Sequence, residues 1–191
     1  STTIAAYTIE VQKQEDTGSP ILYYDFDNEV NGEIEDKSAN NYHGIKNGNF
    51  TTTLGGISGD AGYFDGDGDY LAIKEYFYEN TNFYENITVS AWINSTSQDE
   101  QFIASFDRSE YWRFALNDDA SYFVGFDTSN NIDTDDFGYN QSIADGNWHM
   151  VTAVFDATTQ SGIKKIYIDG ELKETITDVN GGKGLGTGEK R

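Results

Sequence analysis

Cysteine is absent from this 191-residue chain, and basic residues are scarce. The missing thiols exclude disulfide bonds and metal sites with thiolate ligands. Lys and Arg number 12 against 33 Asp and Glu, which gives a net charge of −21. Nucleic acid and anionic membranes attract clustered basic residues, so this charge argues against both as partners. No run of about 18 apolar residues is present that could insert into a membrane.

The acidic charge has two explanations that remain open. It can form an ordinary solvated surface, or it can reflect adaptation to divalent cations or high salt, which bridge or screen the repulsion. The absence of cysteine is consistent with a secreted bacterial protein and equally with a cytosolic one. The chain begins at Ser1 without a Met or signal peptide, which predicts a piece of a longer protein with neighbouring domains.

The hydrophobic content is only 37%, but the chain contains 3 Trp, 13 Tyr and 12 Phe. Each aromatic ring buries a large area, so we expect a compact core despite the few aliphatic residues. The length suits one domain over residues 1–191. Residues 1–19 would lead in with a strand, and residues 178–191, with five glycines, would form a flexible tail.

Polar and apolar residues alternate with period two along most of the chain, and clusters of Gly, Asn, Asp and Ser separate these segments. The pattern predicts an all-β, antiparallel β-sandwich and not a parallel α/β sheet. In the strand from Ile87 to Asn94, the aliphatic side must face the core. Asp169-Gly170, between two β-rich segments, predicts a type I′ hairpin turn. The expected strands are Ile4–Val11, Ile21–Asp27, Ala61–Asp65, Tyr70–Ile73, Ile87–Asn94, Gln101–Asp107, Tyr111–Leu116, Ser121–Phe126, Trp148–Phe155, Ile163–Ile168 and Leu172–Thr177.

Four segments in order carry a family resemblance. They are the Tyr24-Asp-Phe-Asp27 and Asp36–Gly44 pair, Gly62–Leu71, Thr88-Val-Ser-Ala-Trp-Ile93, and Trp148-His-Met-Val151 with its Asp169-Gly170 hairpin. Together they resemble the laminin-G-like (LamG, concanavalin-A-like) jelly-roll family over residues 21–176.

The resemblance implies a jelly-roll sandwich that binds ligands, in a secreted or cell-surface protein such as a large bacterial adhesin. It also implies that Trp148 and Tyr167 serve the core and the hairpin and do not bind a ligand, and that His149 belongs to the scaffold. The family normally ends with a strand that pairs beside its first strand, and no such segment follows Thr177. Either the closing strand is missing from this chain, in which case a partner segment could supply it, or Ile4–Val11 takes its place.

Catalytic motifs are absent from the sequence. Glycoside hydrolases of this fold class carry the motif E-x-D-x-E or E-x-D-x-x-E on one strand, so that alternate side chains point together into the cleft, and neither motif occurs in the sequence. We therefore expect a protein that is not an enzyme. Asp65-Gly-Asp-Gly-Asp69 resembles the start of an EF-hand, but Tyr70 and Tyr76 stand where Gly and Glu are required, so a hairpin turn is favoured.

Calcium is the expected cofactor, because two loops combine several carboxylate and amide oxygens. The first loop belongs to the opening motif, where the resemblance implies a structural calcium bound by Asp27, Asp36 and Asn41. The second is the acidic loop from Asp127 to Asp136, with carboxylates at Asp127, Asp133, Asp135 and Asp136. A solvated acidic loop without metal is the alternative for the second.

A sugar site is expected at the turn from Asp107 to Trp112, which combines an aromatic ring with charged side chains. The predicted ligand-binding residues are Asp107, Arg108, Glu110, Trp112, Asp127, Asn130 and Asn131. The alternative places Trp112 in the core and pairs Arg108 with a neighbouring carboxylate. The sequence thus predicts an extracellular, calcium-dependent lectin module for adhesion to a glycan or cell-surface polysaccharide. A structural or protein-interaction module and a domain of a secreted glycoside hydrolase are the alternatives.

Overall fold

The computed structural model describes residues 2–10, 19–73, 86–106, 112–118, 122–129, 134–158 and 162–177. Within these ranges the secondary structure is entirely β. The strands are β1 (Thr2–Glu10), β2 (Leu22–Val30), β3 (Glu33–Asp36), β4 (Gly44–Asn47), β5 (Thr51–Leu54), β6 (Asp60–Phe64), β7 (Tyr70–Ile73), β8 (Asn86–Ser95), β9 (Gln101–Phe106), β10 (Trp112–Asp118), β11 (Tyr122–Ser129), β12 (Thr134–Asp135), β13 (Gly138–Tyr139), β14 (Trp148–Asp156), β15 (Ile163–Ile168) and β16 (Glu171–Thr177). Nothing in the described ranges forms a helix long and apolar enough to span a lipid bilayer.

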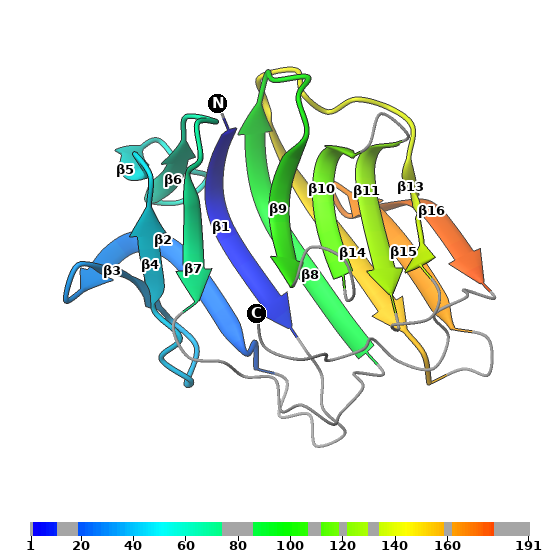
Figure 1. Ribbon diagram of the computed structural model, residues 1–191, viewed down its shortest axis with the longest axis horizontal. Coiled ribbons are helices and arrows are strands. Elements are labelled where there is room, and N and C mark those ends of the chain that lie inside the picture. Colours follow the sequence, from blue (N-terminus) through cyan, green and yellow to red (C-terminus); the bar gives the residue numbers. More distant parts are fainter. Residues whose placement is uncertain are drawn as a thin grey trace.

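Two antiparallel sheets make up the molecule. The larger runs in the order β16-β15-β14-β8-β1-β2-β3-β4-β7, and β6 joins it through β1 and carries β5. The smaller runs β12-β11-β10-β9, with β13 also paired to β11. Figure 1 shows the smaller sheet stacked in front of the half of the larger sheet that contains β8, β14 and β15. The predicted antiparallel sandwich is confirmed.

The core lies between these two sheets. The aliphatic side of β8 from Ile87 to Ile93 is buried, as its alternation predicted. From the smaller sheet, the rings of Phe114 and Phe126 pack edge to face with centroids 6.0 Å apart. Lys164 of β15 is also fully buried. Its Nζ donates to the carbonyl oxygen of Phe126 at 3.0 Å and lies 5.4 Å from the centroid of the Phe137 ring, so the charge is solvated by protein groups.

Strand β1 occupies a central position in the larger sheet. It pairs antiparallel with β2 on one side and with β8 on the other, and Figure 1 shows it running between them. Of the two alternatives for the closing strand, the structure has the one in which the N-terminal strand lies beside the first strand of the opening motif. Without it, β2 and β8 would present unpaired backbone groups at facing edges.

The β15–β16 hairpin turns at Asp169 and Gly170, whose φ angles of 54° and 80° match the predicted type I′ turn. Asp169 fastens this turn to β14, because its carboxylate accepts from the backbone nitrogen of Met150 at 2.9 Å. The imidazole of His149 bridges Asp169 at 2.8 Å and Asp145 at 3.3 Å. Burial acts to lower the pKa of His149, but the hydrogen bonds to Asp169 and Asp145 outweigh it, and the pKa is raised.

Two details of the sequence prediction are wrong. Tyr167 is not a core residue, because the buried positions of β15 are the alternate ones, Ile166 and Ile168. Trp148 likewise lies on the outer side of β14, whose core positions begin at Val151. The short strands β3, β4, β5, β12 and β13 were not predicted, since segments of two to four mostly polar residues show no clear alternation.

Candidate ligand-binding face

Arg113 of β10 and Asp127 of β11 lie directly opposite each other in the smaller sheet. Their neighbours along the strands, Trp112, Phe114 and Phe126, belong to the core. Successive side chains of a strand point to opposite faces of the sheet. Arg113 and Asp127 therefore lie on the outer face of the smaller sheet, the face directed away from the larger sheet.

Two buried carboxylates hold the guanidinium of Arg113. Its Nε lies 2.5 Å from Asp127 Oδ2, and its Nη2 lies 3.0 Å from Asp118 Oδ1. The side chains of Asp118 and Asp127 are 2% and 6% exposed, whereas that of Arg113 is 26% exposed. The planar guanidinium is thereby fixed in one orientation, and it is the member of the trio that solvent reaches most.

The trio carries one positive and two negative charges. In the part of the chain that the structure describes, Asp127 Oδ1 is buried and has no hydrogen-bond partner. A buried carboxylate is costly unless it is paired, so Asp127 depends on Arg113 to compensate its charge.

Gly125 of β11 makes the position of Asp118 possible. A Cβ atom at Gly125 would lie 2.4 Å from Asp118 Oδ2 and 2.6 Å from Asp118 Cβ, which is closer than atoms can approach. Asn117, just before Asp118, has a φ of 50°. This left-handed conformation is one that Asn tolerates better than most residues, and it breaks the regular alternation of β10 immediately before Asp118.

Two phenylalanine side chains are exposed on the same outer face. Phe102 of β9 pairs with Ala115 of β10, and Ala115 pairs with Gly125 of β11. Phe123 is two residues from Gly125 and so shares its face. Phe102 is 54% exposed and Phe123 is 39% exposed. We name this set the outer-face cluster: Phe102, Arg113, Asp118, Phe123 and Asp127.

The outer-face cluster overlaps the predicted ligand-binding set only at Asp127. Trp112 lies in the core and is 4% exposed, which is the alternative that the sequence left open. Its ring packs inward because it precedes the outward Arg113 on β10. The other predicted residues, Asp107, Arg108, Glu110, Asn130 and Asn131, lie outside the described residues.

Sequence reasoning missed Arg113, Asp118, Phe102 and Phe123. A signal for Arg113 was available, since a charged residue between the aromatic residues Trp112 and Phe114 marks the outward side of a strand. Its pairing with Asp127 depends on the register of β10 and β11, which the sequence does not give.

The second predicted calcium loop is only partly described. Asp127 is engaged by Arg113 and therefore is not the open oxygen ligand that was expected. Asp135 ends β12, opposite Thr128, Asp136 is exposed, and Asp133 lies outside the described residues. Calcium in this loop stays a prediction.

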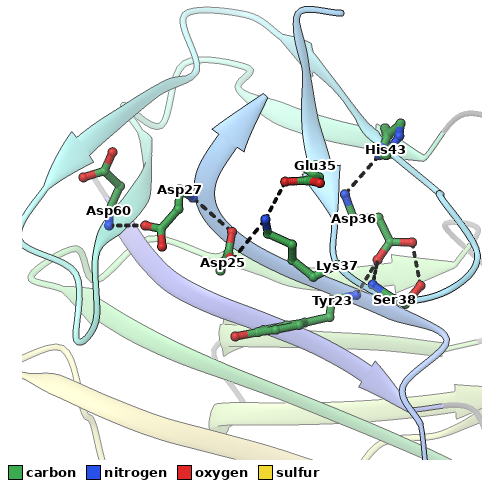
Figure 2. Close-up of polar contacts among 9 residues, drawn as sticks. All are labelled: Tyr23, Asp25, Asp27, Glu35, Asp36, Lys37, Ser38, His43 and Asp60. Atoms are coloured by element: carbon green, nitrogen blue, oxygen red, sulfur yellow. Dashed lines mark hydrogen bonds and ion pairs between the residues drawn. The ribbon is translucent and has the colours of Figure 1, made fainter. Parts of the chain in front are cut away.

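Asp36 is the centre of the opening motif (Figure 2). Its Oδ1 accepts from the backbone nitrogens of Tyr23 and Ser38, both at 2.9 Å. Its Oδ2 accepts from Ser38 Oγ at 2.6 Å and from the backbone nitrogen of Tyr42 at 2.9 Å. The backbone nitrogen of Asp36 donates to His43 Nδ1 at 3.1 Å. Asp36 is 3% exposed, so its carboxylate is satisfied by the protein and pins the loop after β3.

Asp27 takes part in different contacts. Its Oδ1 accepts from the backbone nitrogen of Asp60 at 2.7 Å, and Figure 2 shows Asp25 and Lys37 between it and Asp36. The hydrogen bond from Lys37 to Glu35, at 2.5 Å, raises the pKa of Lys37.

Calcium bound by Asp27, Asp36 and Asn41 therefore stays a prediction, because the two aspartates have different hydrogen-bond partners. The reason lies in β2, where Phe26 has a φ of 64° and the register against β3 shifts between Tyr24 and Glu29. Over the described residues, no group of three or more His, Asp or Glu side chains has an arrangement that could hold a metal ion.

The segment Asp65–Asp69 is a bend between β6 and β7. The hairpin turn that was favoured over an EF-hand is wrong, because β6 pairs with β1 and β5 whereas β7 pairs with β4. Asp69 accepts from the backbone nitrogens of Asn49 and Asp65, at 2.5 Å and 2.7 Å. Asp65 accepts from the backbone nitrogen of Asp67 at 2.8 Å, and this hydrogen bond lowers the pKa of Asp65. These carboxylates organise the chain between β6 and β7.

The chain matches a known protein family. The family model described as the concanavalin A-like lectin/glucanases superfamily, of laminin-G type, matches residues 65–189, about two-thirds of the chain. The matched range contains β7 to β16 and the whole outer-face cluster, whereas β1 and the opening motif precede it. No curated protein and no solved structure matches the chain. The match and the antiparallel sandwich together show that the chain belongs to the concanavalin A-like lectin/glucanase superfamily.

Proposed function

We propose that this domain is a carbohydrate-binding module whose ligand lies on the outer face of the smaller sheet. The observation that carries the proposal is the outer-face cluster, in which Arg113, fixed by two buried carboxylates, shares one face of the sheet with two exposed phenylalanine rings. The superfamily supports a carbohydrate-binding or related module.

The chemistry of the cluster suits a sugar. A sugar ring has an apolar face of C–H groups that packs on an aromatic ring, and a rim of hydroxyl groups that exchange hydrogen bonds with charged side chains. Phe102 and Phe123 offer the first kind of contact, and Arg113 offers the second. Because Asp118 and Asp127 already orient the guanidinium, little side-chain entropy is lost when a ligand binds.

We further propose that the module works outside the cell, in adhesion to a glycan or cell-surface polysaccharide, as part of a larger surface protein. Calcium would belong to the acidic loop of Asp133, Asp135 and Asp136. If calcium binds the folded domain there, millimolar calcium raises the melting temperature and a chelator reverses the rise. An unchanged melting temperature would count against the metal. Catalysis is not part of the proposal, and release of reducing ends from polysaccharides would overturn that point.

The direct test is a glycan array with the wild-type domain and two matched variants. Phe102→Ala removes a ring that is 54% exposed on the proposed face, and Tyr70→Ala removes one that is 55% exposed on β7. We expect Phe102→Ala to weaken the binding of oligosaccharides on the array and Tyr70→Ala to leave it unchanged, with both variants folded by circular dichroism. No signal from the wild-type domain on neutral or acidic glycans, with and without calcium, would refute the proposal and favour a structural or protein-interaction module.

A further inference from the structure

The spacing of Phe102 and Phe123 sets a lower limit on the size of the ligand. The two residues lie on β9 and β11, the two neighbours of β10. Phe102 is opposite Ala115. Phe123 precedes Val124, the partner of Leu116, and so comes level with Asn117, two residues further along β10.

Adjacent strands are about 4.8 Å apart and residues rise about 3.4 Å along a strand, so the two positions are separated by about 12 Å. One hexose ring packs on one phenyl ring and cannot cover both. A ligand that contacts both side chains needs at least two sugar units and crosses β10 obliquely to the strand direction.

The charges on this face limit the chemistry of the ligand. Two carboxylates, Asp118 and Asp127, pair directly with the guanidinium of Arg113. Asp99 and Glu100 immediately precede β9, and the chain as a whole carries a net charge of −21. An acidic sugar, such as a uronic acid or a sulfated unit, would meet repulsion from this field. A neutral sugar would not be repelled, and its hydroxyl groups can both donate and accept hydrogen bonds.

We propose that the outer-face cluster binds a neutral oligosaccharide of two or more units, laid across β9, β10 and β11 so that consecutive or next-nearest sugars pack on Phe102 and Phe123. The inference rests on the proposed function and adds the ligand's charge and minimum length. Arg113 lies two residues from Ala115 on the side away from Phe123, so it donates to hydroxyl groups of a sugar unit at the Phe102 end of the ligand.

Isothermal titration with defined oligosaccharides tests the inference. The probes are oligomers of one to six units from cellulose, xylan, mannan and β-1,3-glucan, with oligogalacturonates of the same lengths as the acidic counterpart. In the neutral series that binds, affinity rises about tenfold from one unit to three, the factor expected for burial of one side of a second aromatic ring. The oligogalacturonates bind more weakly at every length.

Two variants show which rings produce the rise in affinity with chain length. Phe102→Ala and Phe123→Ala should each remove the increase with chain length while leaving the affinity for the single unit within a few-fold, and Phe102→Tyr should retain the increase. Equal affinity for one and three units, or tighter binding of oligogalacturonates, would overturn the inference while leaving the carbohydrate-binding proposal standing. Absence of binding to every probe, neutral and acidic, would instead remove the proposed function itself.

Discussion

Replacing Arg113 by alanine should destabilise the domain far more than an ordinary substitution at a partly exposed position. The change leaves Asp118 and Asp127 buried, 2% and 6% exposed, without the cation that both contact. Removal of one partner from a buried ion pair costs about 3–5 kcal/mol, because the remaining charge is uncompensated. Since Arg113 itself is partly exposed and water can enter the space that it leaves, we expect the lower end, about 3 kcal/mol.

Urea denaturation at pH 7 measures this loss without the screening that guanidinium would introduce. With a slope of about 2 kcal/mol per molar, a loss of 3 kcal/mol moves the midpoint down by about 1.5 M. Arg113→Lys keeps the charge but lacks the fork that reaches two carboxylates, so its midpoint should lie between those of the wild type and the alanine variant.

Neutralising Asp127, which loses its cation in Arg113→Ala, provides the internal control. In the double variant Arg113→Ala with Asp127→Asn, the buried charge is removed, so part of the lost stability returns and the coupling energy should be about 1–3 kcal/mol. A midpoint for Arg113→Ala within about 0.2 M of the wild type, as for a typical surface substitution of less than 0.5 kcal/mol, would refute the reasoning that Arg113 compensates two buried charges.

Four further substitutions test the scaffold, and one of them, Gly44→Ala, is a control. Asp36→Ala leaves the backbone nitrogens of Tyr23, Ser38 and Tyr42 without their acceptor. Urea denaturation should show a loss of about 3 kcal/mol in the free energy of unfolding. A loss under about 1 kcal/mol would mean that water replaces the carboxylate. Gly125→Ala forces Asp118 off its position and should lower the free energy of unfolding by about 1–3 kcal/mol. A Cβ at Gly44 meets nothing closer than 3.3 Å, so the control Gly44→Ala should lower it less. The raised pKa of His149 means that its contribution to stability is complete below the unfolded pKa of about 6.5 and declines as pH rises through the higher folded pKa. His149→Gln should therefore destabilise the domain more at pH 5.5 than at pH 9, and an equal loss at both would contradict the ionic role.

The sequence predicts the scaffold correctly at positions where a single local rule determines the structure. The burial of β8 from Ile87 to Ile93 follows from alternation alone, and the turn at Asp169 and Gly170 follows from the few residues that accept positive φ. Strand β5 was not predicted, because every one of its residues is exposed and the segment has no apolar face. Its pairing with β6 is set by tertiary context.

The candidate site was harder to predict, because it is made by register and not by local sequence. Asp127 was singled out from the acid-rich segment that follows it, yet its partner is Arg113, fourteen residues earlier and across one strand pair. Asp27 and Asp36 are close in the sequence and were expected to converge, but the left-handed conformation of Phe26 gives them different partners. Spacing along the chain cannot report a kink of this kind.

The two acidic regions therefore differ in what they can do for the protein. In the opening motif, both carboxylate oxygens of Asp36 accept hydrogen bonds from backbone nitrogens, and Asp27 Oδ1 accepts from the backbone nitrogen of Asp60. These carboxylates therefore stabilise the fold around β2 and β3. On the outer face of the smaller sheet, the carboxylates fix an arginine that remains accessible beside exposed aromatic rings. The family match covers the second region and not the first. A ligand that uses the rigidity of the sandwich is accordingly proposed to bind at the outer-face cluster, where two carboxylates hold a partly exposed arginine in one orientation.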